Sequence, residues 1–362
     1  MKAKVLPPSQ LDRDLLARWS WLCDANPLYQ SPFYRPQFTL AVAAARPDAR
    51  VAVLERGGNV VGFFPFHLTR GDVAKPVGGH INDYHGPILA PGISVTGPAL
   101  LRSAGLSAYD YNHLPTAFST LAEGAHTFSY SPRMDLSDGY DAYVARKDSR
   151  WTKAQREVRR RQRKTETEIG PLRFAFHDPS EAVHERHVEM KNAQYARMGL
   201  RAMLGSGWVG DVLDRLRTVD EPDFAGVMST LHAGDRLIAA HFGIRAKGVL
   251  HWWFPSYDLA LYKLGPGINL INQCAMTANE HGVTLIDFGK GDEDFKLHFA
   301  DHRVDLCEGS ICRARSMAAT LRQGTQALVG LAERLPLGQY RTVPRRAVAR
   351  LISGVTLPEQ AG

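Results

Sequence analysis

The sequence predicts a mixed α/β protein with two similar units, and three observations lead to that class. The segment from Tyr262 to Lys296 reads as a helix, a short strand and an acidic loop, opened by a Gly-Pro-Gly turn. Two hairpin patterns, Val51 to Leu68 and Val227 to Ile244, each follow predicted helices, which is typical of a tandem repeat. The 362 residues also suffice for two hydrophobic cores.

The first unit is expected to span residues 1–139, with helices before and after its hairpin. The two apolar runs of this hairpin are joined by Arg56-Gly57-Gly58-Asn59, a turn sequence that suits a short hairpin loop. Apolar periodicity and helix-ending residues predict three helices in this unit. These helices are Leu11 to Asp24, Phe38 to Ala45 and about Thr96 to Ala104.

A basic linker helix is predicted over residues 140–170. From Arg146 to Glu168 the chain has ten Lys and Arg against four Asp and Glu, and few apolar residues. Such a helix can bury only one narrow face. With the helical, Arg-rich tail of residues 316–362, it accounts for the net charge of +7, so the rest of the protein is mildly acidic. This distribution argues against DNA binding and favours local contacts with anions.

The second unit, residues 171–315, is expected to begin with a strand at Leu172. Two helices follow, and then three successive strands joined by tight turns at Ala233-Gly234-Asp235 and Lys247-Gly248. A further helix is expected to stop at Gly282. The remaining predicted elements are helices from Glu181 to Arg197, from Trp208 to Arg217 and from Ile268, and strands from Val283 to Phe288 and from Ser310 to Ala314.

The Gly-Pro-Gly turn before Ile268 marks the strongest candidate binding site. A helix that opens on glycines leaves its first N–H groups unbonded, and its dipole favours a negative ligand there. Phosphate groups bind at such helix starts; a plain tight turn is the alternative. We therefore predict a phosphate-bearing cofactor at Gly265, Gly267, Ile268 and Asn269.

The order of these elements resembles the core of the GNAT acyltransferases. More narrowly, GPGINLINQCAMTANEHGVTLIDFGKGDEDFK resembles the C-terminal signature of the CelD/BcsL-type acetyltransferases of bacterial exopolysaccharide biosynthesis, which are similar to the FemAB peptidyltransferases. The segment NDYHGP resembles the family's Asp-Tyr segment, and Phe295 stands where the family often carries Tyr. The matching residues are Gly265, Gly267, Asp287, Gly291, Glu293, Lys296, Asp83 and Tyr84.

The resemblance implies tandem GNAT-like domains that move an acetyl group from acetyl-CoA to a sugar. The acceptor would be the amine or hydroxyl of an exopolysaccharide or of its lipid-linked precursor, and acetyltransferases serving an adhesive holdfast polysaccharide are similar in size and layout. Acyl transfer needs an aligned acceptor, a base and a donor for the developing oxyanion. The catalytic carboxylates are predicted to be Asp287, Glu293 and Asp83, with Asp287 first because crowded carboxylates raise one another's pKa.

Each candidate also has a structural interpretation. Glu293 and its acidic neighbours would simply begin a short helix and stabilise its N-terminus. Residues His298 and His302 have the spacing of a metal pair on a helix, but no HExxH pattern accompanies them, so no metal site is predicted. Core packing, hydrogen bonding or a plain ion pair is the alternative for the predicted substrate-binding residues. These are Tyr84, His85, His241, Trp253 and Lys296.

Two other functions stay open at this point. A FemAB-like transferase would use aminoacyl-tRNA, which the basic linker helix suits. A non-catalytic protein with the same fold would bind an anionic nucleotide through Arg side chains, since their forked donors match phosphate. The Arg residues concerned are Arg156, Arg159, Arg160 and Arg163.

The location expected from the sequence is cytoplasmic. The first residues have no apolar signal region, no apolar run reaches the length of a membrane span, and the four cysteines form no CxxC pair. The basic segments predict peripheral contact with the inner face of the cytoplasmic membrane, since each basic residue near anionic lipid contributes about 1 kcal/mol.

Overall fold

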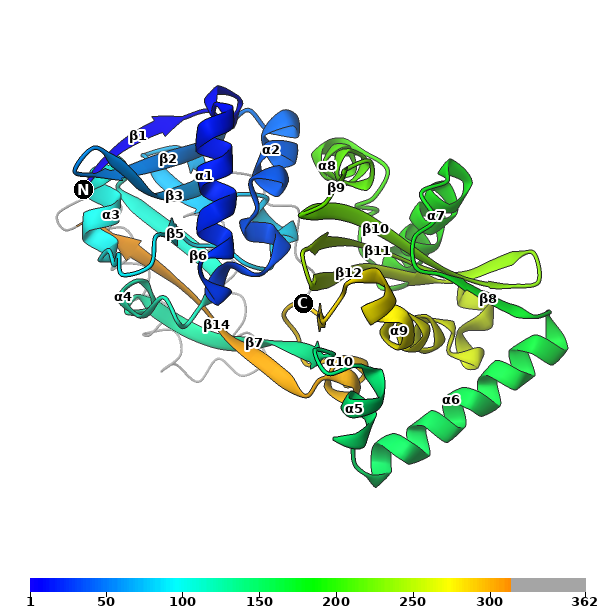
Figure 1. Ribbon diagram of the computed structural model, residues 1–362. Helices are drawn as coiled ribbons and strands as arrows, with labels where there is room; N and C mark the ends of the chain where they lie inside the picture. The colour runs from blue at the N-terminus through cyan, green and yellow to red at the C-terminus, as the bar shows by residue number, and fades with distance from the viewer. Residues whose placement is uncertain (314–362) are drawn as a thin grey trace, which may run out of the picture.

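The computed structural model describes residues 1–313, which form one mixed β-sheet with helices on both faces (Figure 1). The predicted helical tail, residues 316–362, lies outside the described residues. The strands are β1 (Lys2–Leu6), β2 (Ala49–Arg56), β3 (Asn59–Thr69), β4 (Val73–Pro76), β5 (Ile88–Leu89), β6 (Ala108–Pro115), β7 (Ala125–Asp135), β8 (Leu172–Ala175), β9 (Asp220–Glu221), β10 (Phe224–Ala233), β11 (Arg236–Ala246), β12 (Val249–Tyr257), β13 (Leu285–Asp287) and β14 (His302–Cys312). Their order is β1-β2-β3-β4-β6-β14-β7-β13-β12-β11-β10-β8, with β5 on β3 and β9 on β10.

Helices cover both faces of the C-terminal half of the sheet. The helices are α1 (Arg13–Asp24), α2 (Pro36–Ala45), α3 (Gly97–Ser103), α4 (Ser119–Ala122), α5 (Tyr140–Ala145), α6 (Ser149–Glu168), α7 (Glu181–Arg197), α8 (Gly207–Arg217), α9 (Pro266–Thr277) and α10 (Asp294–Phe299). Buried residues of α7 and α8 share a core with Met228, whereas those of α9 share a second core with Val227. Because neighbouring residues of a strand point to opposite faces, α9 lies across the sheet from α7 and α8 (Figure 1).

Most local predictions for the described residues are confirmed. Both predicted hairpins form, as β2–β3 and β10–β11, and α7 has the predicted bounds. The linker helix is α6, and its buried residues form the expected narrow stripe: Trp151, Gln155, Val158 and Thr165. A polar helix of this kind is held by one face only.

Element boundaries after position 265 differ from the prediction. The helix α9 ends at Thr277 and continues as a 3₁₀ turn, Ala278–His281, before Gly282. The strand β13 is shorter than expected, and β14 is much longer than the predicted Ser310 to Ala314. The sequence of β14, HRVDLCEGSIC, mixes charged and apolar residues, so its strand character is set by its two neighbours in the sheet.

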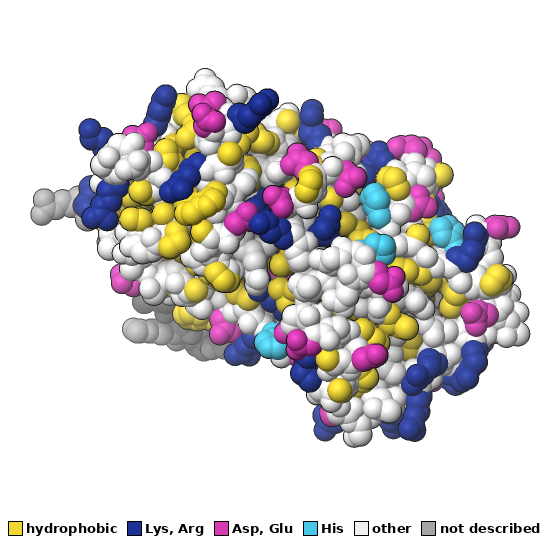
Figure 2. Space-filling view, in the orientation of Figure 1, with side chains coloured by type: hydrophobic (Ala, Val, Ile, Leu, Met, Phe, Trp, Pro, Cys, Tyr) yellow, Lys and Arg dark blue, Asp and Glu magenta, His cyan; other side chains and the backbone are white. Residues whose placement is uncertain are grey.

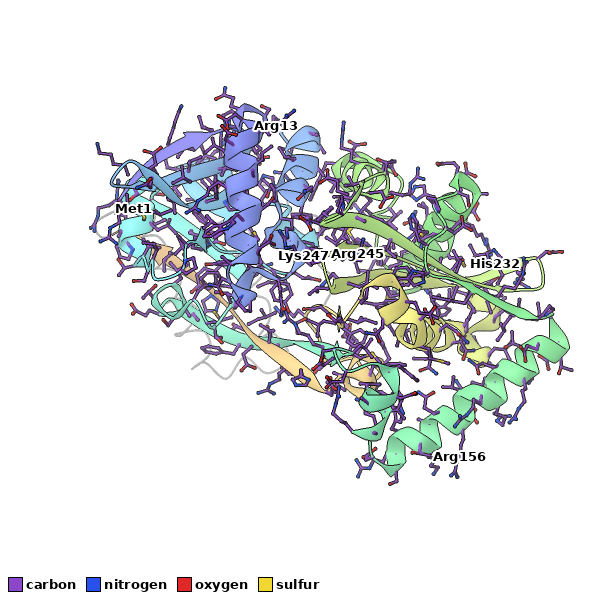
Figure 3. The ribbon with its side chains drawn as sticks, in the orientation of Figure 1. Met1, Arg13, Arg156, His232, Arg245 and Lys247 are labelled. Atoms are coloured by element: carbon purple, nitrogen blue, oxygen red, sulfur yellow. The ribbon has the colours of Figure 1, made fainter. Side chains whose placement is uncertain are left out.

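Strand pairing crosses the predicted boundary between residues 139 and 140. The strand β13 pairs with β12 on one side and with β7 on the other, and β14 lies between β6 and β7. A salt bridge of 2.6 Å between Lys247 and Asp24 also joins the two halves (Figure 3). The chain therefore forms one sheet, and the four-part division 1–139, 140–170, 171–315 and 316–362 stays a prediction.

Candidate active site

The candidate site lies where β12 and β13 separate. These two strands are parallel and share only three register pairs, of which the last is His251 opposite Asp287. Beyond this pair β12 continues to Tyr257, whereas the chain after β13 turns away into the loop before α10. Strands that part in this way leave backbone N–H and C=O groups along the opening without a ladder partner.

The helix α9, which connects β12 to β13, begins with an open N-terminus. Gly265 adopts a left-handed conformation with φ of 63°, which glycine reaches without a Cβ clash, and Pro266 occupies the first helical turn. No side chain caps this helix start. The amide of Asn269 bonds to the carbonyl of Gly265, and no acceptor is found among residues 1–313 for the amides of Gly267 and Ile268.

A cavity of about 310 Å³ lies against this helix start. Arg161 of the basic helix α6 reaches it, because a Cβ atom on Gly265 would lie only 3.1 Å from the Arg161 guanidinium. The amides of α9 and this guanidinium together favour an anion. The cavity is lined by Arg161, Trp252, Pro255, Tyr257, Tyr262, Gly265, Pro266, Gly267, Ile268, Ile271 and Phe295. Of the predicted cofactor-binding residues, Gly265, Gly267 and Ile268 line it, and Asn269 is buried without lining it.

Asp287, the first-ranked catalytic candidate, is completely buried in a network of donors. Its Oδ2 accepts hydrogen bonds from Arg133 Nε at 2.6 Å and Tyr84 Oη at 2.7 Å. Its Oδ1 accepts from Ser131 Oγ at 2.6 Å and from the amide of Gly289 at 3.0 Å. Every acceptor position that a base would use is therefore occupied.

The pKa of Asp287 is lowered, whereas the sequence predicted that it would be raised. Burial raises the pKa of this carboxyl, but the nearby Arg133 guanidinium, His251 and the donated hydrogen bonds outweigh it and hold the pKa below 3.8. The predicted crowding by Asp292 to Asp294 does not occur at this carboxylate, whose charged neighbours are Arg133 and His251. The geometry makes Asp287 an anchor that joins β13 to β7, in place of the predicted base.

Asp83, the second predicted carboxylate, lies on the other side of His251 from Asp287. Its side chain is 22% exposed, and its Oδ2 accepts a 2.8 Å hydrogen bond from His251 Nε2. The side chain of Asn82 fixes this loop, since it bonds to the carbonyl of Val77 and to the amide of Tyr84. Burial raises the pKa of Asp83, but the hydrogen bond and charge of His251 outweigh this effect and lower it overall.

The third predicted carboxylate lies apart from these two. Glu293 is the residue before α10, its side chain is 57% exposed, and it pairs with Lys296 at 2.9 Å. Lys296 also donates to the carbonyl of Lys290, so it has the ion-pair role that the sequence offered as the alternative. The acidic segment starts a short helix, as the structural interpretation expected. Phe295, at the family's Tyr position, lines the cavity.

Of the four remaining predicted substrate-binding residues, three are buried and Trp253 is partly buried. His85 accepts the amides of Asn112 and His113 through Nε2, and burial lowers its pKa well below 6.5. His241 accepts the amide of Trp253 and stacks on Trp252, and burial again lowers its pKa.

Tyr84 is committed to Asp287, and Trp253 packs edge-on against Phe33 and Phe38. The predicted direct contact with a substrate is therefore corrected for Tyr84, His85 and His241. All three side chains are buried and each makes a hydrogen bond inside the protein, although the Nδ1 atoms of His85 and His241 have no partner among the described residues.

Several residues of the site carry no sequence signal. Arg133 and Ser131 lie in SYSPRMDL, which matches no motif, and only the pairing of β7 with β13 brings them to Asp287. Gly289 closes the Asp-Phe-Gly segment of the sequence, but only the fold shows that a Cβ atom there would lie 2.5 Å from Asp83 Oδ2. His251 had a weak signal as a histidine in a strand, and its partner Asp83 is 168 positions away in the chain.

The basic helix α6 presents its arginines to solvent. Arg156, Arg159, Arg160 and Arg163 are all exposed, and Figure 2 shows Lys and Arg side chains gathered along the edge where α6 runs, with Arg156 on its outer side in Figure 3. Arg160 and Arg161 both pair with Glu157.

Two kinds of feature are not found among residues 1–313. They contain no group of three or more His, Cys, Asp or Glu side chains placed to hold a metal ion. The two histidines with metal-like spacing lie in different elements: His298 is in α10, where it stacks on Trp151 of α6, and His302 begins β14. In the same range, every helix is too short or too polar to cross a membrane.

A protein family matches the part of the chain that contains the candidate site. Residues 152–297 match the family described as acetyltransferase (GNAT) domain, a range that includes the cavity, His251 and Asp287. A search of curated proteins gave no match.

Among solved structures, FemX is similar with a TM-score of 0.55 and 12% identity, over 91% of this chain and 100% of that chain. The C-terminal domain of a protein assigned as lysylphosphatidylglycerol synthetase, from Agrobacterium fabrum, has a TM-score of 0.52 and 12% identity, over 86% and 96% of the two chains. A conserved protein of unknown function from Bacteroides thetaiotaomicron has a TM-score of 0.51 and 12% identity, over 81% and 97%. The protein thus has a GNAT-like fold, as predicted, and the part that matches the acetyltransferase (GNAT) family lies in its C-terminal half.

Proposed function

We propose that this protein transfers an acetyl group from acetyl-CoA to an amine or hydroxyl of a sugar, in an exopolysaccharide or its lipid-linked precursor. The observation that carries the proposal is the cavity at the start of α9, lined by Arg161 and by two residues whose amides have no acceptor in the described part of the chain. The match to a GNAT acetyltransferase domain supports the same reaction class.

In this proposal the cavity holds part of the donor. The phosphates of coenzyme A lie against the amides of Gly267 and Ile268 and beside Arg161, where the helix dipole favours negative charge. The aromatic and apolar lining, which includes Trp252 and Tyr257, suits the pantetheine arm. A volume of about 310 Å³ is at the low end for ligand pockets, so the rest of the coenzyme stays in solvent.

The chemistry requires no nucleophilic side chain. The acceptor N–H or O–H group attacks the thioester carbon, a base takes the acceptor proton, and the C–S bond breaks. The products are the acetylated sugar and coenzyme A, whose thiol carries the transferred proton. With Phe295 at the family's Tyr position, no phenol is present there to protonate the leaving thiolate. Asp83, the partly exposed carboxylate beside the strand opening, is the proposed base.

The sugar acceptor rests on the resemblance of the Gly265 to Lys296 segment to the CelD/BcsL-type acetyltransferases. Proposed peripheral membrane contact and proposed nucleotide binding both use the exposed arginines of α6, at Arg156, Arg159, Arg160 and Arg163. Neither use conflicts with a donor site at Arg161, whose side chain lies at the cavity.

Aminoacyl-tRNA is the second candidate donor, and the position of α6 beside the cavity favours it. An exposed row of arginines next to the donor site would contact an RNA backbone. Filter binding of charged tRNA at 50 and 200 mM salt distinguishes the donors, since phosphate contacts weaken steeply with salt. Tight, salt-sensitive binding of tRNA with no binding of acetyl-CoA would favour this second function.

The direct test of the first function is calorimetric titration with acetyl-CoA. We expect a dissociation constant in the micromolar range for the unsubstituted protein, about −8 kcal/mol. Gly267→Trp should abolish binding because the indole fills the cavity. Gly267→Ala is the matched control: its Cβ atom would meet Tyr257 at 3.4 Å, an ordinary contact, so binding should persist. Equal binding by both variants would contradict the assignment of this cavity.

A further inference from the structure

His251 is completely buried, although it stands at the point where β12 and β13 separate. Its Nε2 donates to Asp83 Oδ2 at 2.8 Å, and its Nδ1 lies 3.6 Å from Asp287 Oδ1. The imidazole thus sits between the partly exposed carboxylate of Asp83, from the N-terminal half, and the buried carboxylate of Asp287, from the C-terminal half. His251 therefore contacts Asp83 directly and lies beside Asp287.

The ring of His251 has little freedom to turn. Phe33 packs edge-on against it with ring centroids 4.7 Å apart, and Tyr84 does so at 6.4 Å. Asp287 is itself fixed by Arg133, Tyr84, Ser131 and the Gly289 amide. A ring held in this way can present its Nε2 donor in one direction only, toward Asp83.

The position of Asp83 relative to the cavity follows from the strand. Trp252, the residue after His251 in β12, lines the cavity, and neighbouring residues of a strand point to opposite faces, so His251 and its partner Asp83 lie on the face of the sheet away from the cavity. The close approach of Gly289, where any Cβ would meet Asp83 Oδ2, places the same carboxylate beside the end of β13. Asp83 therefore lies at the opening between β12 and β13, across the sheet from the proposed donor cavity, where an acceptor meets a thioester that passes between the two strands.

We propose that His251 is the positioning residue of the acyl transfer, holding Asp83 as the carboxylate that accepts the proton of the sugar. Asp83 alone touches the acceptor; His251 orients it and is in turn kept in place by the packing of its ring against Phe33 and Tyr84. When the acceptor attacks the thioester carbon, its proton moves to Asp83, the C–S bond breaks, and the proton is passed on to the coenzyme A thiolate. This inference rests on the proposed function.

The arrangement has a consequence for substitutions at position 251. Glutamine can place an amide nitrogen near the position of Nε2 and still donate to Asp83, whereas phenylalanine keeps the ring volume and removes the donor. A positioning role predicts that these two variants differ in turnover. A role in packing alone predicts that phenylalanine, the closer match in shape, is the better tolerated.

The test measures two properties of the unsubstituted protein, D83N, H251F and H251Q. The first is acetyl-CoA affinity by calorimetry; the second is release of coenzyme A thiol from acetyl-CoA, with glucosamine or water as acceptor, separated into kcat and KM. We expect all four proteins to bind acetyl-CoA within threefold. Turnover should fall about 100-fold in D83N and H251F, and less than tenfold in H251Q.

The double variant D83N/H251F should be no slower than either single variant, because both changes disable one unit. His232→Gln is the matched control, since His232 lies at the far end of β10 (Figure 3) and should leave turnover unchanged. Thermal unfolding of each variant shows whether it remains folded.

The outcomes separate the two proposals. Turnover of H251F equal to that of the unsubstituted protein would overturn the role of His251, as would an H251Q variant as slow as H251F. Loss of acetyl-CoA affinity in step with turnover would show a structural role instead. If the unsubstituted protein fails to bind acetyl-CoA, the donor proposal is overturned, and the inference with it. Binding without any thiol release would overturn the assignment of a base at this position.

Discussion

The start of α9 and the Asp287 network are neighbours in the structure but opposite in character. At the start of α9, two amides have no acceptor among residues 1–313 and face a cavity. At Asp287, four donors converge on one carboxylate that has no exposed surface. An open set of donors can bind a ligand, whereas a closed set stabilises the fold. A polar residue in a motif is available to bind a ligand only where it lacks hydrogen-bond partners within the protein.

The largest expected effect tests the closed region. Asp287→Ala leaves the Arg133 guanidinium buried without its carboxylate, which should reduce the free energy of unfolding by about 3–5 kcal/mol. Chemical denaturation measures this change. Asp235→Asn is the control, because the Arg173–Asp235 pair is fully exposed on the Asp side and should leave stability unchanged. An Asp287→Ala protein as stable as its parent would contradict an anchoring role.

The next prediction concerns His187, a buried histidine of α7 whose Nδ1 lies 2.8 Å from Ser256 Oγ. Burial, with the nearby charges of Lys191 and His184, lowers the pKa of His187 from 6.5 to about 3. Between these values the unfolded chain binds a proton that the folded protein does not, so stability decreases as pH falls from 6.5 toward 3. The contribution is about 1.4 kcal/mol per pH unit.

His187→Gln should therefore reduce the slope of unfolding free energy against pH between pH 6 and 4. Denaturation at several pH values gives the slope for the parent and for the variant. The same slope in the parent and His187→Gln proteins would show that His187 is protonated in the fold.

The smallest expected effect tests the open region. Arg161→Gln removes the guanidinium at the cavity and should weaken acetyl-CoA binding about tenfold, or about 1.4 kcal/mol. Arg160→Gln is a matched control, because Arg160 shares Glu157 with Arg161 but does not line the cavity. Calorimetry compares the two variants. If both bind acetyl-CoA equally well, the guanidinium takes no part in donor binding.

The fold was largely predictable because its elements have local signals. The hairpins, α7 and α6 follow from turn residues and apolar spacing that act within a few residues of one another. The strand β14 was mostly missed, since its mixed sequence gains a strand conformation only between β6 and β7. Its place in the N-terminal half of the sheet depends on pairing across about 170–200 positions, which no local pattern encodes.

The candidate site was predictable only in part for the same reason. The helix start at Gly265 is a local feature, and the sequence located it. The role of Asp287 was misjudged, because its partners Arg133, Ser131 and Tyr84 come from distant segments. A pKa depends on what surrounds a carboxyl in space, so crowding by neighbours in sequence was the wrong guide.

By itself, the sequence determined the elements, the basic helix and the glycine start of α9, since backbone conformation and helix dipoles depend on nearby residues. Tertiary structure alone decided which polar groups are satisfied. Two strands that part after His251 leave an opening for a ligand, and a third strand brings an arginine that closes the site at Asp287. Burial and hydrogen bonding depend on which segments pack together in the folded protein. They distinguish groups that are free to bind a ligand from groups, such as Asp287, that stabilise the fold.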